Sequence, residues 1–319
     1  MEFLNLLGQT INITLVFSTA LILAGLGGVF SERSGVINIG LEGIMIAGAF
    51  GAAVFSYYAE DAGMGELSPY IGLLAAILLG VIFAWIHAIA SIRFKANQVV
   101  SGVVINFLAL GMTVYLVKLL FEGSGQSPTL QFAFTKLTIP GVTDIPFIGT
   151  VLHAYPTTYL AIILVFIAYY VLYRTPFGLR LRAVGEHPSA ADTVGVQVLR
   201  TRYIGVLLSG VLAGLGGATI TLTTTSMFSH NTISGQGFIA IAAMIFGKWH
   251  PVGVFGAACF FGLSQALKDL LQMYGLSNWI PSEFIYMLPY LFTVLVLIGA
   301  VSRAYPPAAL GEPYDPGKR

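Results

Sequence analysis

The chain has 319 residues, of which 56% are hydrophobic and only 9% are charged, and its formal net charge at pH 7 is +1. A soluble domain carries about 25% charged residues, so this composition excludes a chain that covers itself with a polar surface in water. The near-zero net charge offers no basic surface for a nucleic acid, and the single cysteine, Cys259, leaves no disulfide framework. We therefore expect an all-α polytopic membrane protein.

A helix needs about 20 apolar residues to cross the hydrocarbon core of a bilayer. The sequence contains about nine apolar runs near that length, so we expect about nine transmembrane helices, within a range of about eight to ten. The first run lacks the basic leader region of a signal peptide, so we expect it to remain in the protein. The seventh run is shorter than the others. The runs are 11–30, 37–58, 69–92, 98–121, 155–173, 203–225, 234–247, 251–271 and 283–301.

The basic residues set the expected orientation, because short cytoplasmic loops collect Lys and Arg. Segment 174–202, between the fifth and sixth runs, is rich in arginine and is therefore expected to be cytoplasmic. Alternation then places the C-terminus inside and the N-terminus outside. Only three basic residues fall on the external side, namely Lys118, Lys136 and Lys268.

A short internal repeat appears in the hydrophobic sequence. The hexapeptide LAGLGG occurs at 23–28 and again at 212–217, and a second similar block follows each copy, beginning at Ile37 and at Ile233. Under the expected orientation the two copies cross the membrane in opposite directions. An inverted-topology repeat of this kind is typical of transporters, with the substrate path between the halves near mid-membrane. Chance matches among Gly, Ala and Leu are the alternative.

We expect one transmembrane domain over 1–319, with a first repeat at about 11–121 and a second at about 203–301. In each repeat a stretch rich in polar residues and glycine interrupts the apolar sequence, at 31–43 and at 229–237. Irregular backbone at membrane depth is tolerated only where it is buried in protein or lines a cavity. The sequence therefore predicts discontinuous helices at these two places.

The sequence contains no motif that would supply energy or catalysis. It lacks a Gly-x-x-x-x-Gly-Lys-Ser/Thr loop, a His-Glu-x-x-His pair and a Gly-x-Ser-x-Gly turn. We therefore expect a transport subunit without an ATPase site, with no catalytic residue and no metal site. The few ionisable residues expected inside the membrane, Glu42, His87 and Glu283, keep an ion-gradient-driven carrier as a less favoured class.

Segment 174–202 is also predicted to contain a short helix. Pro188 suits the first turn of this helix, and Gly195 suits the position just past its end. From the residues alone, the helix either rests on its own protein and lipid head groups or docks onto a partner. The side chains available for a small apolar face are Ala190, Ala191 and Val194.

Two stretches carry a resemblance to a known family. They are ERSGVINIGLEGIMIAGAF at 32–50 and TPFGLRLRAVGEHPSAADTVGV at 175–196. Together they resemble the permease subunits of ABC importers for ribose-type sugars and branched-chain amino acids. The first stretch is most similar to the nucleoside-importer branch, whose receptors are basic-membrane-protein-type lipoproteins. The resemblance implies a permease that forms half of the translocation pathway for nucleosides, with a monosaccharide or a branched-chain amino acid as the alternative cargo.

The resemblance also implies partners and a location. A cytoplasmic ATP-binding subunit would hold ATP and Mg²⁺, so this chain would need no cofactor of its own. A second permease chain, either a different paralogue or an identical copy, would complete the pathway, and an extracytoplasmic substrate-binding lipoprotein would deliver the cargo. The assembly would lie in the plasma membrane of a prokaryote, surrounded by lipid.

In such permeases the cytoplasmic loop that matches 174–202 carries the coupling helix, which sits in a groove of the ATPase subunit. The resemblance therefore favours docking as the role of this segment. The positions that match the coupling motif are Gly185, Glu186, His187, Pro188, Ala190, Ala191 and Gly195.

Polar and aromatic residues at the two predicted interruptions are candidates for contact with the cargo. A neutral nucleoside needs an aromatic face and a few hydrogen-bonding groups. For each candidate the alternative is a local role, such as capping the helix that follows. The candidates are Asn38, Glu42, Asn106, Phe228, Asn231, Ser234, Gln236 and Phe238.

Overall fold

The computed structural model describes residues 2–138, 140–141, 145, 147–273, 284, 287, 291, 294 and 305–316. Every named element in this part of the chain is helical, and η2 and η3 are π-helical turns that extend the helices before them. The elements are α1 (Glu2–Arg33), α2 (Leu41–Asp61), η1 (Gly65–Leu67), α3 (Ser68–Ala88), η2 (Ile89–Arg93), α4 (Gln98–Leu120), α5 (Ile148–Leu152), α6 (Pro156–Arg174), α7 (Pro176–Glu186), α8 (Pro188–Thr193), α9 (Val198–Thr219), η3 (Ile220–Thr225), α10 (Gln236–Phe246) and α11 (Pro251–Met273).

Seven helices in the described part of the chain are long and apolar enough to cross a membrane, which confirms the predicted all-α membrane fold. The predicted short run 234–247 is α10, whose 11 residues make a helix of about 16 Å, half the thickness of a bilayer core. The predicted run 283–301 lies outside the described residues except for four isolated positions. In the part of the connection 122–154 that the structure describes, one short helix is present, α5.

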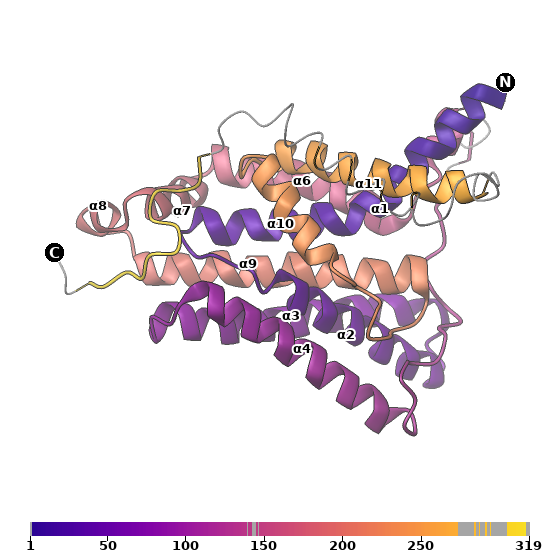
Figure 1. Ribbon diagram of the computed structural model, residues 1–319, viewed down its shortest axis with the longest axis horizontal. Helices are drawn as coiled ribbons and strands as arrows, with labels where there is room; N and C mark the ends of the chain where they lie inside the picture. Colours follow the sequence, from indigo (N-terminus) through magenta and orange to yellow (C-terminus); the bar gives the residue numbers. More distant parts are fainter. Residues whose placement is uncertain are drawn as a thin grey trace.

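The centre of the molecule is the antiparallel pair α1 and α9, which run side by side in Figure 1. A Cβ on Gly27 of α1 would lie 2.9 Å from the carbonyl oxygen of Ser209 in α9. A Cβ on Gly216 of α9 would lie 3.0 Å from the carbonyl oxygen of Ala20 in α1. Alignment of the two LAGLGG copies pairs Gly27 with Gly216 and Ala20 with Ser209, so the two close contacts are the ones that a two-fold relation between the halves would produce.

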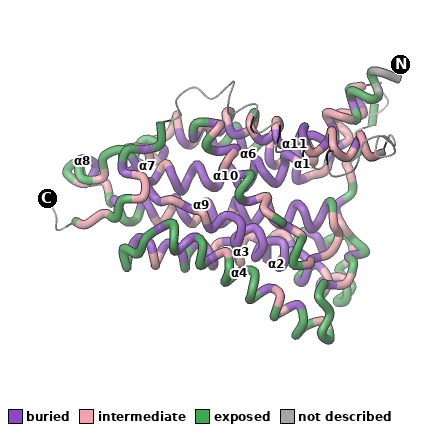
Figure 2. The backbone as a smooth tube through the Cα atoms, in the orientation of Figure 1, coloured by how far each residue is buried: buried purple, intermediate pink, exposed green. Residues whose placement is uncertain are grey.

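The other helices are divided between the two sides of the central pair. Helices α2 and α3 pack on α9, whereas α10, α11 and α6 pack on α1. Most of α1, α2 and α9 is buried, whereas much of α4 is exposed (Figure 2). The exposed residues of α4 include large apolar side chains such as Phe107. Such side chains suit a surface that meets lipid or another membrane chain.

The spacing of Gly210 and Gly214 permits the close approach of α9 to α3. A Cβ on Gly210 would lie 2.6 Å from the carbonyl oxygen of Gly80, and one on Gly214 would lie 2.5 Å from that of Ala76. Small residues at this spacing are a common means by which membrane helices pack backbone to backbone.

The two ends of the bundle carry different segments. One end holds α7, α8 and residues 305–316, and we call it the α7–α8 end (Figure 1). Both Lys95 and Arg33 form ion pairs there, with Asp315 at 3.0 Å and with Glu186 at 3.8 Å. The opposite end holds the connections that follow α2 and α4.

Candidate functional site

The first interruption of the helices is the buried segment 34–40, between α1 and α2. Side chains of α3 and α4 hold its backbone. Ile37 donates its N–H to Gln98 Oε1 at 2.7 Å, and its carbonyl accepts from Nε2 of His87 at 2.9 Å. Asn106 donates to the carbonyl of Ile39 at 3.1 Å and accepts from Gly43 N at 2.7 Å. The prediction of a break here is confirmed, and side chains replace the missing helical hydrogen bonds.

The second interruption is segment 226–235, between η3 and α10. Ser226 and Ser234 both have positive φ, at 51° and 46°, a conformation that non-glycine residues rarely adopt. The chain therefore turns sharply at both ends of the segment. Between them the ring of Phe228 is buried edge-on against Phe50 of α2, with centroids 5.6 Å apart.

The two interruptions meet at Glu42. This residue lies in the first turn of α2, and its two carboxylate oxygens accept hydrogen bonds from the N–H groups of Gly235 and Gly237, each at 2.6 Å. Those N–H groups lie at the start of α10, where the helix dipole favours a negative charge. A side chain of α2 thus caps the start of α10, and we call this contact the Glu42 latch.

The predicted pathway residues divide into two groups. Asn38, Glu42 and Phe228 are buried, and Asn106 is partly buried and bonded to backbone. Asn38 donates from Nδ2 to Ser209 Oγ at 2.9 Å. The residues that remain accessible all belong to the second interruption or the start of α10, and they are Asn231, Ser234, Gln236 and Phe238.

The predicted coupling segment forms two helices rather than one. Helix α8 has the expected boundaries, with Pro188 in its first turn and Gly195 just past its end at φ 85°. Sequence reasoning missed α7, although Thr175 and Pro176 are a recognisable start signal. Thr175 Oγ1 accepts from Gly178 N at 3.3 Å, and Pro176 occupies the first turn.

The proposed apolar face of α8 is divided between two sides. Ala191 is only 4% exposed and packs with Val184 and Val198, so it fixes α8 to its own protein. Ala190 is exposed, and Val194 is 78% exposed. The three side chains predicted to be available for a small apolar face therefore do not lie together on one exposed side, because a helix of 6 residues needs one side to pack on its own protein.

The end of α7 touches the end of α1. A Cβ on Gly185 would overlap the carbonyl oxygen of Arg33, so only glycine permits this approach. Glu186 and His187 beside it are exposed. Arg33 also donates to the carbonyl of Trp249 at 3.1 Å. Partial burial, and secondly the charge of Arg33, lower the pKa of His250.

Residues 305–316 cross the α7–α8 end, and we call them the C-terminal strap. Ala309 N donates to the carbonyl of Gly185 at 2.9 Å, and Gly311 N donates to that of Gly35 at 3.1 Å. Arg202 of α9, which is 1% exposed, donates from Nη1 to the carbonyl of Glu312 at 2.7 Å. Sequence reasoning missed the strap, although a cation at the start of a hydrophobic run signals a need for a buried partner.

Among the residues that the structure describes, no group of three or more His, Cys, Asp or Glu side chains is placed to hold a metal ion.

Comparisons with known proteins point to one family. The family model for the permease component of branched-chain amino acid transport systems matches residues 10–297. A guanosine ABC transporter permease of Bacillus subtilis is 50% identical, and a nucleoside ABC transporter permease of Lactococcus lactis is 42% identical, each over 100% of both chains. A glucose ABC transporter permease of Haloferax volcanii is 28% identical over 85% of this chain and 76% of its own length.

Proposed function

The chain belongs to the family of branched-chain amino acid transport system permease components, and from this premise we propose that it forms half of the translocation pathway of an ATP-driven nucleoside importer. The observation that supports a nucleoside as the cargo is the similarity to two nucleoside permeases, at 50% and 42% identity over the full length. The fold adds the discontinuous helices that transporters place at their substrate path.

The contacts at the α7–α8 end support a route for the driving force. In the proposal, the ATPase subunit docks onto the exposed side of α8, which presents Ala190 and Val194. Movement of α8 passes through α7 to Gly185 and Glu186. These two residues contact Arg33, where the first interruption begins. The Glu42 latch then joins the first interruption to the start of α10.

The remaining parts of the proposal follow from this role. The ATPase subunit binds ATP and Mg²⁺, and this chain supplies no hydrolytic site. A second permease chain, different or identical, faces this one, and an extracytoplasmic lipoprotein delivers the cargo. The protein lies in the plasma membrane of a prokaryote. The concentration of arginine and lysine at the α7–α8 end supports a cytoplasmic location for that end.

The accessible residues of the second interruption have the chemistry that a nucleoside requires. Phe238 offers an aromatic face, Asn231 and Gln236 offer amides, and Ser234 offers a hydroxyl. None of them carries a charge, which fits a neutral cargo that must bind weakly enough to leave. We propose these four as pathway contacts.

The proposal is tested by reconstituting the complete importer in vesicles, with ATP enclosed and the receptor outside. Guanosine is expected to accumulate only when ATP is present. Glucose is the second candidate cargo, because the Haloferax volcanii relative is a glucose permease. Glucose is therefore tested beside guanosine, together with ribose and leucine as the other alternative cargoes. Accumulation of one of these in place of guanosine would contradict the cargo. Uptake that persists without ATP would contradict the class of transporter.

A further inference from the structure

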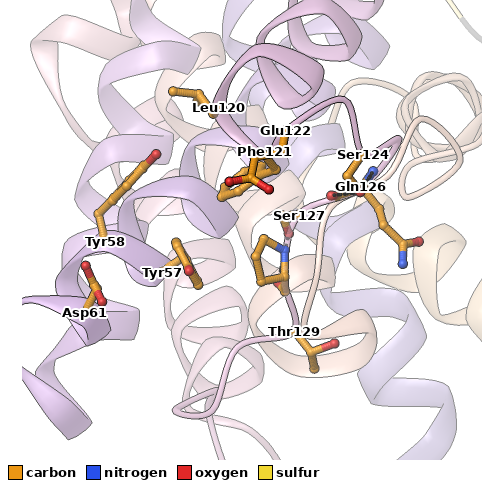
Figure 3. A pocket seen from close by; sticks show the side chains of 11 residues that line it. Tyr57, Tyr58, Asp61, Leu120, Phe121, Glu122, Ser124, Gln126, Ser127 and Thr129 are labelled. Atoms are coloured by element: carbon orange, nitrogen blue, oxygen red, sulfur yellow. Dashed lines mark hydrogen bonds between the residues drawn. The ribbon is translucent and has the colours of Figure 1, made fainter.

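A hollow lies at the end of the bundle opposite α7 and α8. The last turns of α2 and α4 and the connection that follows α4 enclose a space of about 530 Å³, and Figure 3 shows the side chains around it. This volume falls within the range of about 300–1,000 Å³ that small-molecule sites occupy. The hollow is therefore large enough for a small polar molecule.

Aromatic rings form the inner wall of the hollow. Phe121 meets Tyr57 edge-on with centroids 5.4 Å apart, and it lies nearly parallel to Tyr58, at 18° and 6.3 Å. Tyr58 is 44% exposed, so its ring stays accessible from the hollow. Accessible aromatic rings stack on nucleobases whatever the base, because every base has a π-face.

Carboxylates stand at the rim. Asp61 follows Tyr58 by one turn of α2, and Glu122 follows Phe121. In the described part of the chain, neither Asp61 nor Glu122 forms an ion pair, and both are exposed. A carboxylate is a suitable acceptor for ribose hydroxyl groups. Two like charges also disfavour an anionic lipid head group in the same place.

The floor of the hollow is bonded to the second interruption. Ser127 donates its N–H to the carbonyl of Phe228 at 2.8 Å, and its Oγ accepts from Phe228 N at 2.9 Å. Phe228 packs against Phe50, two turns before Tyr57 on α2. A molecule in the hollow would therefore contact the elements that hold the start of the proposed pathway.

We propose that this hollow is a receiving site, where a nucleoside released by the receptor first binds this chain. The base stacks on Tyr58 and Phe121, and the ribose hydroxyls donate to Asp61 and Glu122. The site rests on the proposed function, since it takes the same cargo one step before the second interruption.

The first test compares uptake kinetics in the reconstituted importer. Loss of a stacked ring or of a ribose acceptor, in Tyr58→Ala or Asp61→Asn, is expected to raise the KM for guanosine about tenfold with little change in kcat. Matched controls are Tyr115→Ala and Glu66→Gln, which change exposed residues of the same types outside the hollow. Unchanged KM in both hollow variants, with active wild type, would overturn the receiving site alone. Absence of ATP-driven guanosine uptake by the wild type would instead refute the proposed function.

The second test needs no transport. In a Cys259→Ser background, Thr129→Cys places the only thiol in the lining of the hollow, and Ala62→Cys places one outside it. Guanosine is expected to slow the labelling of Thr129→Cys by an impermeant thiol reagent, without the receptor, and to leave Ala62→Cys unaffected. The analogue 2′,3′-dideoxyguanosine is expected to protect less, because it lacks the hydroxyls that the carboxylates would bind. Protection that appears only when the receptor is present would identify a receptor-docking surface and overturn the proposal.

Discussion

The Glu42 latch gives the sharpest test of how α2 is joined to the start of α10. The change is Glu42→Ala, which removes the acceptor from Gly235 N and Gly237 N and leaves both N–H groups without it. A hydrogen bond to a charged group contributes about 1.5–3 kcal/mol, so the pair contributes about 3–6 kcal/mol. Since about 1.4 kcal/mol is a factor of ten, local opening at the start of α10 should become about 10²–10⁴-fold more frequent.

Hydrogen exchange in the purified protein measures this opening. The amides of Gly235 and Gly237 are expected to exchange at least about 100-fold faster in the variant than in the wild type. Glu60→Ala is the matched control, because Glu60 also accepts two backbone N–H groups, from Gln131 and Phe132, but through solvent-exposed bonds. Water replaces such an acceptor, so a change of less than about tenfold is expected there. Unchanged exchange at Gly235 and Gly237 would refute the latch.

Three further predictions concern the α7–α8 end. Val194→Arg should leave the melting temperature unchanged and abolish co-purification of the ATPase subunit, whereas Ala191→Arg should lower the melting temperature, because Ala191 is buried; retained ATPase binding in Val194→Arg would contradict the docking side. Gly185→Ala should uncouple ATP hydrolysis from uptake, while Gly111→Ala, whose Cβ meets open space, should not; equal coupling in the two variants would show that the Arg33 contact transmits nothing. Deletion of 305–319 should lower the melting temperature, because it leaves the buried Arg202 guanidinium without its acceptor. Adding Arg202→Met to the deletion variant should recover part of the lost melting temperature. A further decrease on adding Arg202→Met would argue against that explanation.

The positions of the interruptions were predictable from the sequence, because polar residues and glycine within an apolar run have few other uses. The short α10 was predictable for the same reason. The function of Glu42 was not, because its two partners are backbone N–H groups nearly two hundred residues away, which no local pattern encodes. Pairing the two sequence blocks that begin at Ile37 and Ile233 would set Glu42 opposite Phe238, which is next to Gly237 in the chain, but such a pairing identifies no hydrogen bond.

The α7–α8 end shows a second limit. The boundaries of α8 follow from Pro188 and Gly195, but the direction of Ala191 depends on Val184 and Val198, which lie outside the helix. Two of the contacts that hold the C-terminal strap are backbone hydrogen bonds to the distant residues Gly185 and Gly35, and such bonds leave no mark in composition or periodicity. Local signals therefore located the elements, and long-range contacts decided which side of each one is free.

In the proposed mechanism, nucleotide binding by the ATPase subunit docked on α8 changes the conformation of the second interruption. The direct measurement uses Ser234→Cys in the Cys259→Ser background of the reconstituted importer, since Ser234 is exposed in that segment. Its labelling rate with an impermeant thiol reagent should differ between the nucleotide-free and the ATP–vanadate-trapped complex, and the difference should vanish when Val194→Arg is added. Equal labelling rates in the two nucleotide states of an active complex would contradict the account.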